Sequence, residues 1–300
     1  MKRVDGSAGK GAKRVGLWKA VAVMAAALAL GLALVGCSSG DSAGGSDSID
    51  GANNVGDANG KTLRVAMELA YPPFETKDDA GNPEGLAVDF IRDFGAAYGY
   101  DVQIENTAWD GLIPSLQTGK ADLVISSMTI TDERKESVDF SDPYAMAQLA
   151  ILANANSGVA SIDDLNQPGK KVAVKTGSTG DVYATKNLAN AEIVRLADES
   201  ACVTEVVQGK ADGFLYDQLT IYRNHAANPD TTEAVFIPFQ DVESWGIAVK
   251  KGNTELLDQL NQFIAKSKTD GEFDRLTEKY LSEEKKAFDE YGFKWFFDFE

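Results

Sequence analysis

Two segments of the chain share one helix-to-strand pattern, and this pairing constrains the fold more than any other feature. Residues 117–125 read Gln-Thr-Gly-Lys-Ala-Asp-Leu-Val-Ile, and residues 207–215 read Val-Gln-Gly-Lys-Ala-Asp-Gly-Phe-Leu. Each segment has the order of a helix end, a glycine cap and an apolar strand. A chance match of a common turn is the alternative. Otherwise, the pattern predicts two α/β lobes whose strand ends present polar groups.

The segments around these repeats alternate between strand and helix patterns. Residues 62–67, 101–106 and 245–249 read as strands, and residues 86–97 carry apolar side chains at helical spacing. A strand, helix, strand order predicts parallel strands with right-handed crossovers. From residue 61, about 240 residues remain, which is enough for one large or two small α/β lobes.

The N-terminus has the pattern of a secretion signal. Basic residues precede an apolar run at 20–35, which is short for a membrane-spanning helix. The run ends at Leu34-Val-Gly-Cys37, which is similar to the lipobox of bacterial lipoproteins, so we expect residues 1–36 to be removed and Cys37 to carry the lipid. An uncleaved anchor helix with an incidental cysteine is the alternative. Residues 37–60 are rich in Gly, Ser, Asn and Asp and predict a flexible tether.

Charge and cysteine content narrow the possible partners. The chain has a net charge of −17, and the loss of residues 1–36, with six basic and one acidic side chain, would make it −22. This charge argues against nucleic acid and against an anionic lipid surface as the partner. Cys202 is the only other cysteine, so no intrachain disulfide is possible once Cys37 is lipidated. The helical apolar pattern around Cys202 predicts a buried structural thiol.

Polar residues at 126–134 follow the apolar end of the first repeat. Thr131 and two acidic residues read as the N-cap and first turn of a helix that carries Arg134. In open α/β sheets ligands bind at such strand ends, and a guanidinium suits a planar carboxylate. The alternative is a surface Arg134 paired with Glu133 or Glu136.

Other strand ends also carry polar side chains. The strand at 62–67 runs into a loop with two prolines, the strand at 170–175 runs into a glycine and hydroxyl-rich helix start, and the second repeat ends in Tyr-Asp. Free N–H groups at that helix start could hold a carboxylate, with an ordinary capped turn as the alternative. The helix start is not a phosphate loop, because no Gly-Lys-Ser/Thr follows at the required spacing. The side chains at these ends are Glu68, Tyr71, Lys175, Ser178, Thr179 and Asp217.

Together these motifs resemble the family of extracytoplasmic solute-binding proteins that serve polar amino acid ABC transporters. The resemblance covers about residues 61–283, and its most specific pieces are Tyr71-Pro-Pro-Phe-Glu75, Trp109-Asp-Gly-Leu-Ile-Pro114, residues 126–134 and Val138-Asp-Phe-Ser-Asp-Pro-Tyr144. It implies a two-lobe α/β fold of the type II periplasmic-binding-protein kind, with two hinge strands and the ligand in the cleft between the lobes.

The resemblance also implies domain boundaries. Lobe I would comprise residues 61–147 and 244–283, and lobe II residues 148–243. An aromatic C-terminal tail follows at 284–300, and its rings must be covered or must form a contact patch.

The family's contacts, carried over to matching positions, imply how an amino acid would bind. Its α-carboxylate would bind Arg134, assisted by Thr129 and the helix start, and its α-ammonium would bind Asp217 and oxygens around Ser127. Each charge of a zwitterion that leaves water needs a partner of opposite charge. Because Arg134 and Asp217 would lie on opposite lobes, we expect them to bridge the cleft only when the zwitterion is present. The aromatic positions on either side of the ligand match Tyr71 and Trp109. The full set of expected ligand-binding residues is Glu68, Tyr71, Trp109, Ser126, Ser127, Thr129, Arg134, Lys175, Ser178, Thr179 and Asp217.

Glu68 and Lys175 match positions that in some family members reach the ligand's side chain. Together they suit the amide of glutamine, which is the favoured ligand. Glu68 alone would suit lysine, arginine or ornithine, and tryptophan beside the ligand also occurs in cystine binders. Lys175 opposes a cationic ligand by like-charge repulsion unless it points away. The alternative is a Glu68–Lys175 pair with no ligand role.

The sequence therefore predicts a lipid-anchored, monomeric receptor outside the cytoplasm that captures an amino acid for a membrane permease, with no cofactor, no metal and no catalytic residue. The alternative is an enzyme of the cyclohexadienyl or arogenate dehydratase kind on the same fold. His225 is the only histidine, so neither a Ser-His-Asp nor a metal centre is supported. A sensory input module is disfavoured, because no transmembrane or signalling segment follows residue 283.

Overall fold

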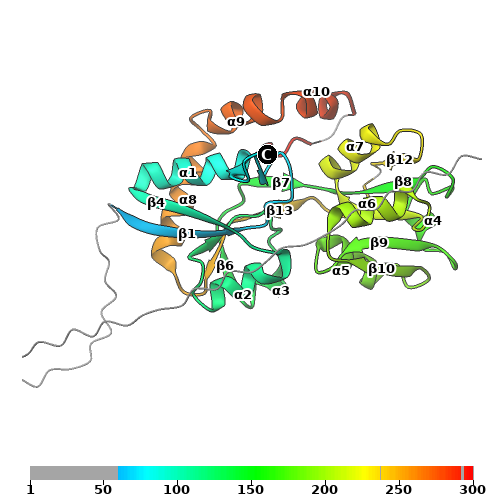
Figure 1. Ribbon diagram of the computed structural model, residues 1–300, viewed down its shortest axis with the longest axis horizontal. Helices are drawn as coiled ribbons and strands as arrows, with labels where there is room; N and C mark the ends of the chain where they lie inside the picture. Colours follow the sequence, from blue (N-terminus) through cyan, green and yellow to red (C-terminus); the bar gives the residue numbers. More distant parts are fainter. Residues whose placement is uncertain (1–59, 237, 292–293, 300) are drawn as a thin grey trace, which may run out of the picture. The chain divides into compact units, whose positions relative to one another are not determined.

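Two five-stranded sheets form the framework of the protein, one in each of two lobes (Figure 1). The computed structural model describes residues 60–236, 238–291 and 294–299, all within the unit that comprises residues 55–300. The expected signal segment, Cys37 and all but Gly60 of the expected tether lie outside the described residues. The expectation of a two-lobe α/β fold is confirmed.

Lobe I is built on the sheet β4-β1-β5-β14-β6. Strand β1 runs parallel to β4 and β5, whereas β14 runs antiparallel to β5 and β6. Helix α1 buries Leu86, Phe90 and Phe94, which lie four residues apart on one face, against the sheet. The strands are β1 (Lys61–Met67), β4 (Tyr100–Asn106), β5 (Leu123–Val124), β6 (Val138–Phe140) and β14 (Ala248–Lys250), with a small hairpin of β2 (Thr76–Lys77) and β3 (Pro83–Glu84). The helices are α1 (Leu86–Tyr98), η1 (Trp109–Gly111), α2 (Leu112–Gln117), α3 (Asp132–Lys135), α8 (Thr254–Ser267) and α9 (Glu272–Tyr280).

Lobe II is built on the sheet β10-β9-β11-β8-β12. Strand β8 is buried along its whole length, with Ile151 in the apolar cluster on one face of the sheet and Leu152 in the cluster on the other. Cys202 is buried on α6 in the second cluster, as expected. The strands are β8 (Leu149–Asn154), β9 (Lys171–Lys175), β10 (Glu192–Leu196), β11 (Gly213–Asp217) and β12 (Thr232–Val235). The helices are α4 (Ile162–Leu165), α5 (Thr179–Asn187), α6 (Glu199–Val207) and α7 (Gln218–Ala227).

The two repeated segments adopt the same local structure. Gly119 and Gly209 follow the ends of α2 and α6 with φ values of 72° and 68°, a left-handed conformation that favours glycine. In each repeat, the aspartate of the Gly-Lys-Ala-Asp sequence accepts a 2.8 Å hydrogen bond from a backbone N–H of the neighbouring strand. The matching pairs are Asp122 with Arg64 and Asp212 with Lys171. The prediction of two similar α/β units is confirmed.

Two antiparallel strands, β7 (Ala145–Ala147) and β13 (Glu243–Trp245), carry the chain between the sheets. The C-terminal residues pack against these hinge strands after α10 (Ser282–Tyr291): the Met146 N–H donates to the Phe296 carbonyl at 2.7 Å, and the Phe296 ring lies 5.5 Å from that of Trp245. Three aromatic residues of the tail are buried against the body, namely Phe288, Trp295 and Phe296.

The expected single strand at 245–249 is wrong. Strand β13 ends at Trp245 and β14 begins at Ala248, with Gly246 between them. A Cβ at Gly246 would lie 2.8 Å from the Ile130 side chain, so the chain passes through a space that admits only glycine without a shift.

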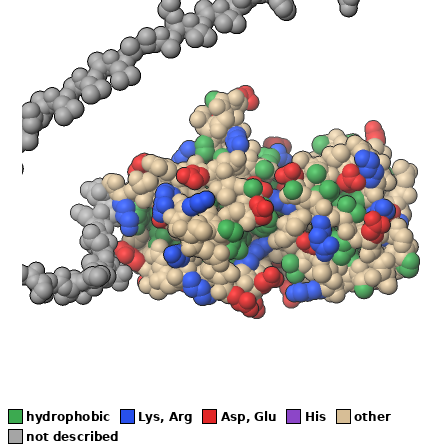
Figure 2. Space-filling model, turned by 60° about the horizontal axis from the view of Figure 1, so that its bottom comes forward, with side chains coloured by type: hydrophobic (Ala, Val, Ile, Leu, Met, Phe, Trp, Pro, Cys, Tyr) green, Lys and Arg blue, Asp and Glu red, His purple; other side chains and the backbone are tan. Residues whose placement is uncertain are grey.

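Charged side chains are spread over the surface. On the face drawn in Figure 2, acidic and basic side chains are interspersed, although the whole chain carries a net charge of −17.

Candidate functional site

Four strand ends, two from each lobe, bring the expected site residues together. Strands β1 and β5 end just before Glu68 and Ser126, and β9 and β11 end at Lys175 and Asp217. One pocket is lined by every expected ligand-binding residue except Lys175, which lies beside it and pairs with Glu68. The lining residues are Glu68, Tyr71, Glu75, Trp109, Ser126, Ser127, Thr129, Arg134, Leu149, Ser178, Thr179, Tyr216, Asp217, Glu243 and Trp245.

Arg134 lies on the short helix α3, which Thr131 caps by accepting a hydrogen bond from the Arg134 N–H. Its guanidinium donates to the carbonyls of Thr129, at 2.7 Å, and Gly177, at 3.1 Å, and lies 5.2 Å from the centre of the Trp109 ring. Burial lowers the pKa of Arg134, and the charge of Glu243 opposes that shift. Within the described part of the chain Arg134 forms no ion pair, so its charge is available to an external carboxylate.

Asp217 caps helix α7 and is only 6% exposed. Its Oδ1 accepts from the N–H groups of Leu219 and Thr220 and from the Tyr71 hydroxyl, at 2.7 Å for the last. Among residues 60–236, 238–291 and 294–299, its Oδ2 accepts only from the Thr220 hydroxyl. Burial raises the pKa of Asp217, while these hydrogen bonds oppose the shift. Since each carboxylate oxygen has two acceptor sites, Oδ2 retains capacity for an ammonium.

Glu68 and Lys175 form an ion pair from opposite lobes, with side chains 13% and 4% exposed. Glu68 also accepts from the Trp109 N–H at 3.3 Å, and the Lys175 ammonium lies 5.2 Å from the centre of the Trp109 ring. The pair therefore places one acceptor and one donor group at the edge of the pocket beside an aromatic ring.

Ser127 joins the pocket to a buried acid. It has a φ of 46°, uncommon for a residue other than glycine, and its hydroxyl donates to Glu75 at 3.1 Å. Glu75 is 1% exposed, and burial raises its pKa well above the usual value. Burial therefore favours the neutral form of this acid, while the hydrogen bond from Ser127 opposes that shift.

The hydroxyls of Thr129 and Thr179 both donate to one oxygen of Glu243, at 2.8 and 2.9 Å. Ser178 is instead the N-cap of α5, where its hydroxyl accepts from the Asp181 N–H. Two of the hydroxyls expected to hold a ligand carboxylate therefore hold a carboxylate of the protein.

Protein groups already cross the cleft. The Tyr71 hydroxyl of lobe I donates to Asp217 of lobe II, and Arg134 of lobe I donates to the carbonyl of Gly177 in lobe II. The expectation that Arg134 and Asp217 bridge the lobes only when a zwitterion is present stays a prediction, although each of them has a protein partner on the opposite lobe. Both find partners on the opposite lobe because buried polar groups are unstable without hydrogen bonds.

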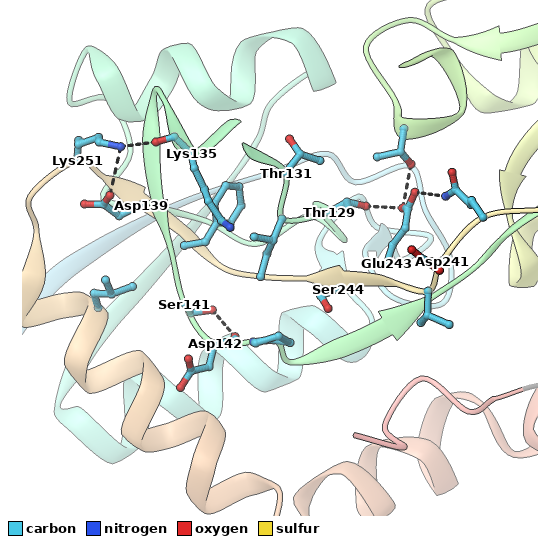
Figure 3. Close-up of a pocket in the computed structure, with 17 residues that line it drawn as sticks. Thr129, Thr131, Lys135, Asp139, Ser141, Asp142, Asp241, Glu243, Ser244 and Lys251 are labelled. Atoms are coloured by element: carbon cyan, nitrogen blue, oxygen red, sulfur yellow. Dashed lines mark hydrogen bonds and ion pairs between the residues drawn. The ribbon is translucent and has the colours of Figure 1, made fainter. Parts of the chain in front are cut away.

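The site has two cavities of very different size. The pocket between the strand ends has a volume of about 40 Å³, and the groove beside it has about 990 Å³. The groove shares Thr129, Thr179 and Glu243 with the pocket (Figure 3). Because the pocket is this narrow, we expect side chains or lobes to move when an amino acid enters.

Sequence reasoning missed several residues that line this pocket. Glu75 ends the Tyr-Pro-Pro-Phe-Glu motif, but the motif does not reveal that its side chain turns inward. Tyr216 directly precedes Asp217 in the second repeat, which is a signal that could have identified it. Leu149, Glu243 and Trp245 lie at the hinge, where the sequence shows no polar pattern that marks a site.

Other kinds of site find no support in the described ranges. Within residues 60–236, 238–291 and 294–299, no helix has the length and apolar composition needed to span a membrane. The same residues contain no group of three or more His, Cys, Asp or Glu side chains that could hold a metal ion. His225 lies on α7, and its Nδ1 lies 3.2 Å from the Thr232 hydroxyl.

Comparisons with known proteins agree with this arrangement. Residues 63–283 match the family of bacterial extracellular solute-binding proteins, family 3. The chain is 36% identical over 228 residues to the "Probable histidine-binding protein" of Neisseria gonorrhoeae, a match that covers 75% of this chain and 85% of that protein. It is 33% identical over 222 residues to the L-cystine-binding protein TcyJ of Escherichia coli, with coverage of 73% and 82%.

A solved structure gives the same result. An ancestral arginine-binding protein bound to glutamine has 38% identity and a TM-score of 0.68, and the match covers 74% of this chain and 98% of that one. The family match over residues 63–283 includes strands of both sheets. The chain therefore belongs to the family of bacterial extracellular solute-binding proteins, family 3.

Proposed function

We propose that this protein is the substrate-binding component of an ABC importer, which captures a polar amino acid between its lobes and delivers it to a permease in the membrane. The observation that carries the proposal is a cation and a carboxylate at one pocket, supplied by opposite lobes. Arg134 has only neutral partners in the described residues, and Asp217 has an oxygen with remaining acceptor capacity. A zwitterion needs both charges to be matched when it leaves water.

The ligand's main-chain groups would use the two walls of the pocket. Its α-carboxylate would bind Arg134 and the hydroxyls of Thr129 and Thr179. Its α-ammonium would bind Asp217 Oδ2 and oxygens of Ser126 and Ser127. The rings of Tyr71 and Trp109, together with the helix start at Ser178, would enclose the ligand.

Glutamine is the favoured ligand, with basic amino acids or cystine next. The amide of glutamine can donate to Glu68 and accept from Lys175, which lie together at the pocket edge. A cationic side chain would meet Lys175, which repels it. The relatives named above bind, by their names, histidine, cystine or arginine, and one structure holds glutamine, so titration must decide among these classes.

We further propose that the protein is a monomer held outside the cytoplasm by a lipid on Cys37, with residues 1–36 removed. The lobes would comprise residues 61–147 with 244–283, and residues 148–243. No cofactor takes part in this function. Mass spectrometry of the protein from its own membrane would detect the lipid at the N-terminal cysteine.

Isothermal titration of residues 38–300 with the twenty amino acids and cystine tests the proposal. We expect heat with at least one polar amino acid, and no heat with any of them would overturn the proposal. Arg134→Ala should weaken binding by about 100-fold or more, because it removes the charge opposite a desolvated carboxylate. Its melting temperature should stay near that of the wild type.

Lys135→Ala is a matched control, because it removes an adjacent and exposed positive charge that pairs with Asp132. This variant should bind as the wild type does. Retained affinity in Arg134→Ala would refute the role of Arg134. Turnover of arogenate or prephenate by the purified protein would instead support the dehydratase alternative.

A further inference from the structure

Glu243 holds the two lobes together from the hinge. It is the first residue of β13, and its Oε2 accepts from Thr129 of lobe I and Thr179 of lobe II, at 2.8 and 2.9 Å. Its Oε1 accepts from Gln240 at 2.7 Å (Figure 3). One carboxylate therefore receives three side-chain hydrogen bonds at the boundary between the small pocket and the large groove.

The same hydroxyls belong to the site for the ligand's α-carboxylate in the proposed function. An α-carboxylate and a glutamate carboxylate offer the same two oxygens and the same charge, so one hydroxyl pair suits both. Arg134 lies close enough to Glu243 that each charge shifts the other's pKa. The carboxylates of Glu243 and of the ligand cannot both accept from these two hydroxyls at the same time, because two negative charges so close together repel each other.

We propose that Glu243 is an internal competitor of the ligand: its carboxylate occupies part of the α-carboxylate site and clasps the lobes, and the incoming amino acid displaces it. This inference rests on the proposed function, since it uses the same hydroxyl pair. The clasp lowers the apparent affinity for the ligand, because the protein must open this contact before the site is complete.

The groove beside the pocket gives the displaced carboxylate a place to go. Glu243 lines that groove, whose volume is about 990 Å³. A rotation of the Glu243 side chain into the groove would bring the carboxylate into water. The backbone of β13, paired with β7, can stay in place.

Titration and small-angle X-ray scattering of Glu243→Ala and Glu243→Gln test the inference. We expect Glu243→Ala to bind the amino acid found for the wild type about tenfold more tightly. Without amino acid, the same variant should have a larger radius of gyration, because the link that the Glu243 carboxylate makes between Thr129 and Thr179 is lost. Glu243→Gln keeps the size and one acceptor oxygen, so both effects should be smaller; it also serves if the alanine variant does not fold.

Asp241→Ala is the matched control. Asp241 is exposed and lines the same groove, two residues from Glu243. The substitution therefore removes the same charge from the same groove. This variant should match the wild type in affinity and radius of gyration. An affinity in Glu243→Ala that equals the wild-type value or falls below it would overturn the inference.

The two hypotheses fail in different ways. A wild-type protein that binds no amino acid overturns the proposed function. A wild-type protein that binds, together with a Glu243→Ala variant of unchanged affinity, overturns only the internal competitor. The radius of gyration tests the clasp without any ligand, and an unchanged value in Glu243→Ala overturns it.

Discussion

The Glu68–Lys175 pair places two opposite charges where water has little access. Its side chains are 13% and 4% exposed, and the two residues come from different lobes. For such a pair, the loss of hydration largely offsets the attraction between the charges. The pair therefore adds little to stability, which is consistent with the proposed contact of both side chains with the ligand.

The variant Lys175→Met tests this explanation. Removal of the ammonium leaves the Glu68 carboxylate without its partner, so the free energy of unfolding should fall by about 3 kcal/mol, as measured by urea unfolding. Affinity for glutamine should fall by about tenfold, because one charged hydrogen bond to the amide is lost. Affinity for arginine should rise, because the repulsion is removed.

The double variant Glu68→Gln with Lys175→Met is the control for stability. It removes both charges, so most of the lost stability should return. Unchanged glutamine binding in Lys175→Met would contradict the assigned contact with the side-chain amide.

Glu199 should give the protein a pH-dependent stability. Loss of hydration raises its pKa from 4.5 to about 8, helped by the charges of Asp217 and Glu68 and opposed by Lys175 and Arg223. Between these two pH values the folded chain binds more protons than the unfolded chain, so the free energy of unfolding falls as the pH rises. Urea unfolding from pH 4.5 to 8 should show a smaller fall for Glu199→Gln than for the wild type.

Glu192→Gln provides the comparison, because the Glu192 side chain is 61% exposed. Its unfolding free energy should follow the wild-type pH profile. The buried acids Glu75, Asp217 and Glu243 contribute slopes of the same sign, so the informative quantity is the difference between the wild type and Glu199→Gln. Identical profiles for these two proteins would contradict the assignment.

Residues at strand ends could be placed from the sequence, and Glu243 could not. Ser126 and Asp217 follow apolar strands directly, so a local pattern reveals them. Glu243 lies 114 residues from Thr129 and 64 from Thr179 along the chain. Its position depends on tertiary structure that no local pattern encodes, which is why it was not among the expected site residues.

At the scale of elements, strand existence and the parallel pairing of β1 with β4 and β5 were predictable, and the pairing of the hinge strands was not. The apolar run at 245–249 predicted one strand, whereas β13 pairs with β7 and β14 pairs with β5 and β6. Periodicity reports which side chains are buried, and it contains no information about the partner strand. The change of partner at Gly246 could therefore be found only in the structure.

The C-terminal aromatic residues act as part of the hinge packing. Phe296 is fully buried, with its ring 5.2 Å from that of Phe74 and 5.5 Å from that of Trp245. Phe296→Ala should lower the free energy of unfolding by about 4 kcal/mol, because it leaves a cavity among these rings. Urea unfolding measures this loss.

Phe299→Ala is a matched truncation at a partly buried ring of the same segment. It should lower the free energy of unfolding by a smaller amount, since less apolar surface returns to water. Equal losses in the two variants would contradict the conclusion that Phe296, which packs against the hinge strands, stabilises the fold more than Phe299 does.

At the scale of the whole molecule, the repeats predicted two lobes, and the contacts that close them were not predictable. Arg223 of lobe II donates to the Pro72 carbonyl of lobe I at 2.5 Å and pairs with Glu284 of α10 at 3.7 Å. These contacts join segments about 60 to 150 residues apart, so they follow from the relative placement of the lobes. Composition and periodicity do not determine that placement.

The small volume of the pocket has a kinetic consequence. A ligand cannot enter a space of about 40 Å³, so association must follow an opening step of the protein. In stopped-flow fluorescence from Trp109 and Trp245, the observed rate constant should rise with amino acid concentration and then level off at the opening rate. A linear rise at all concentrations would contradict this order of events. Glu243→Ala should raise the plateau, because the Glu243 carboxylate at the hinge would limit the rate of opening and therefore the maximum rate of ligand binding.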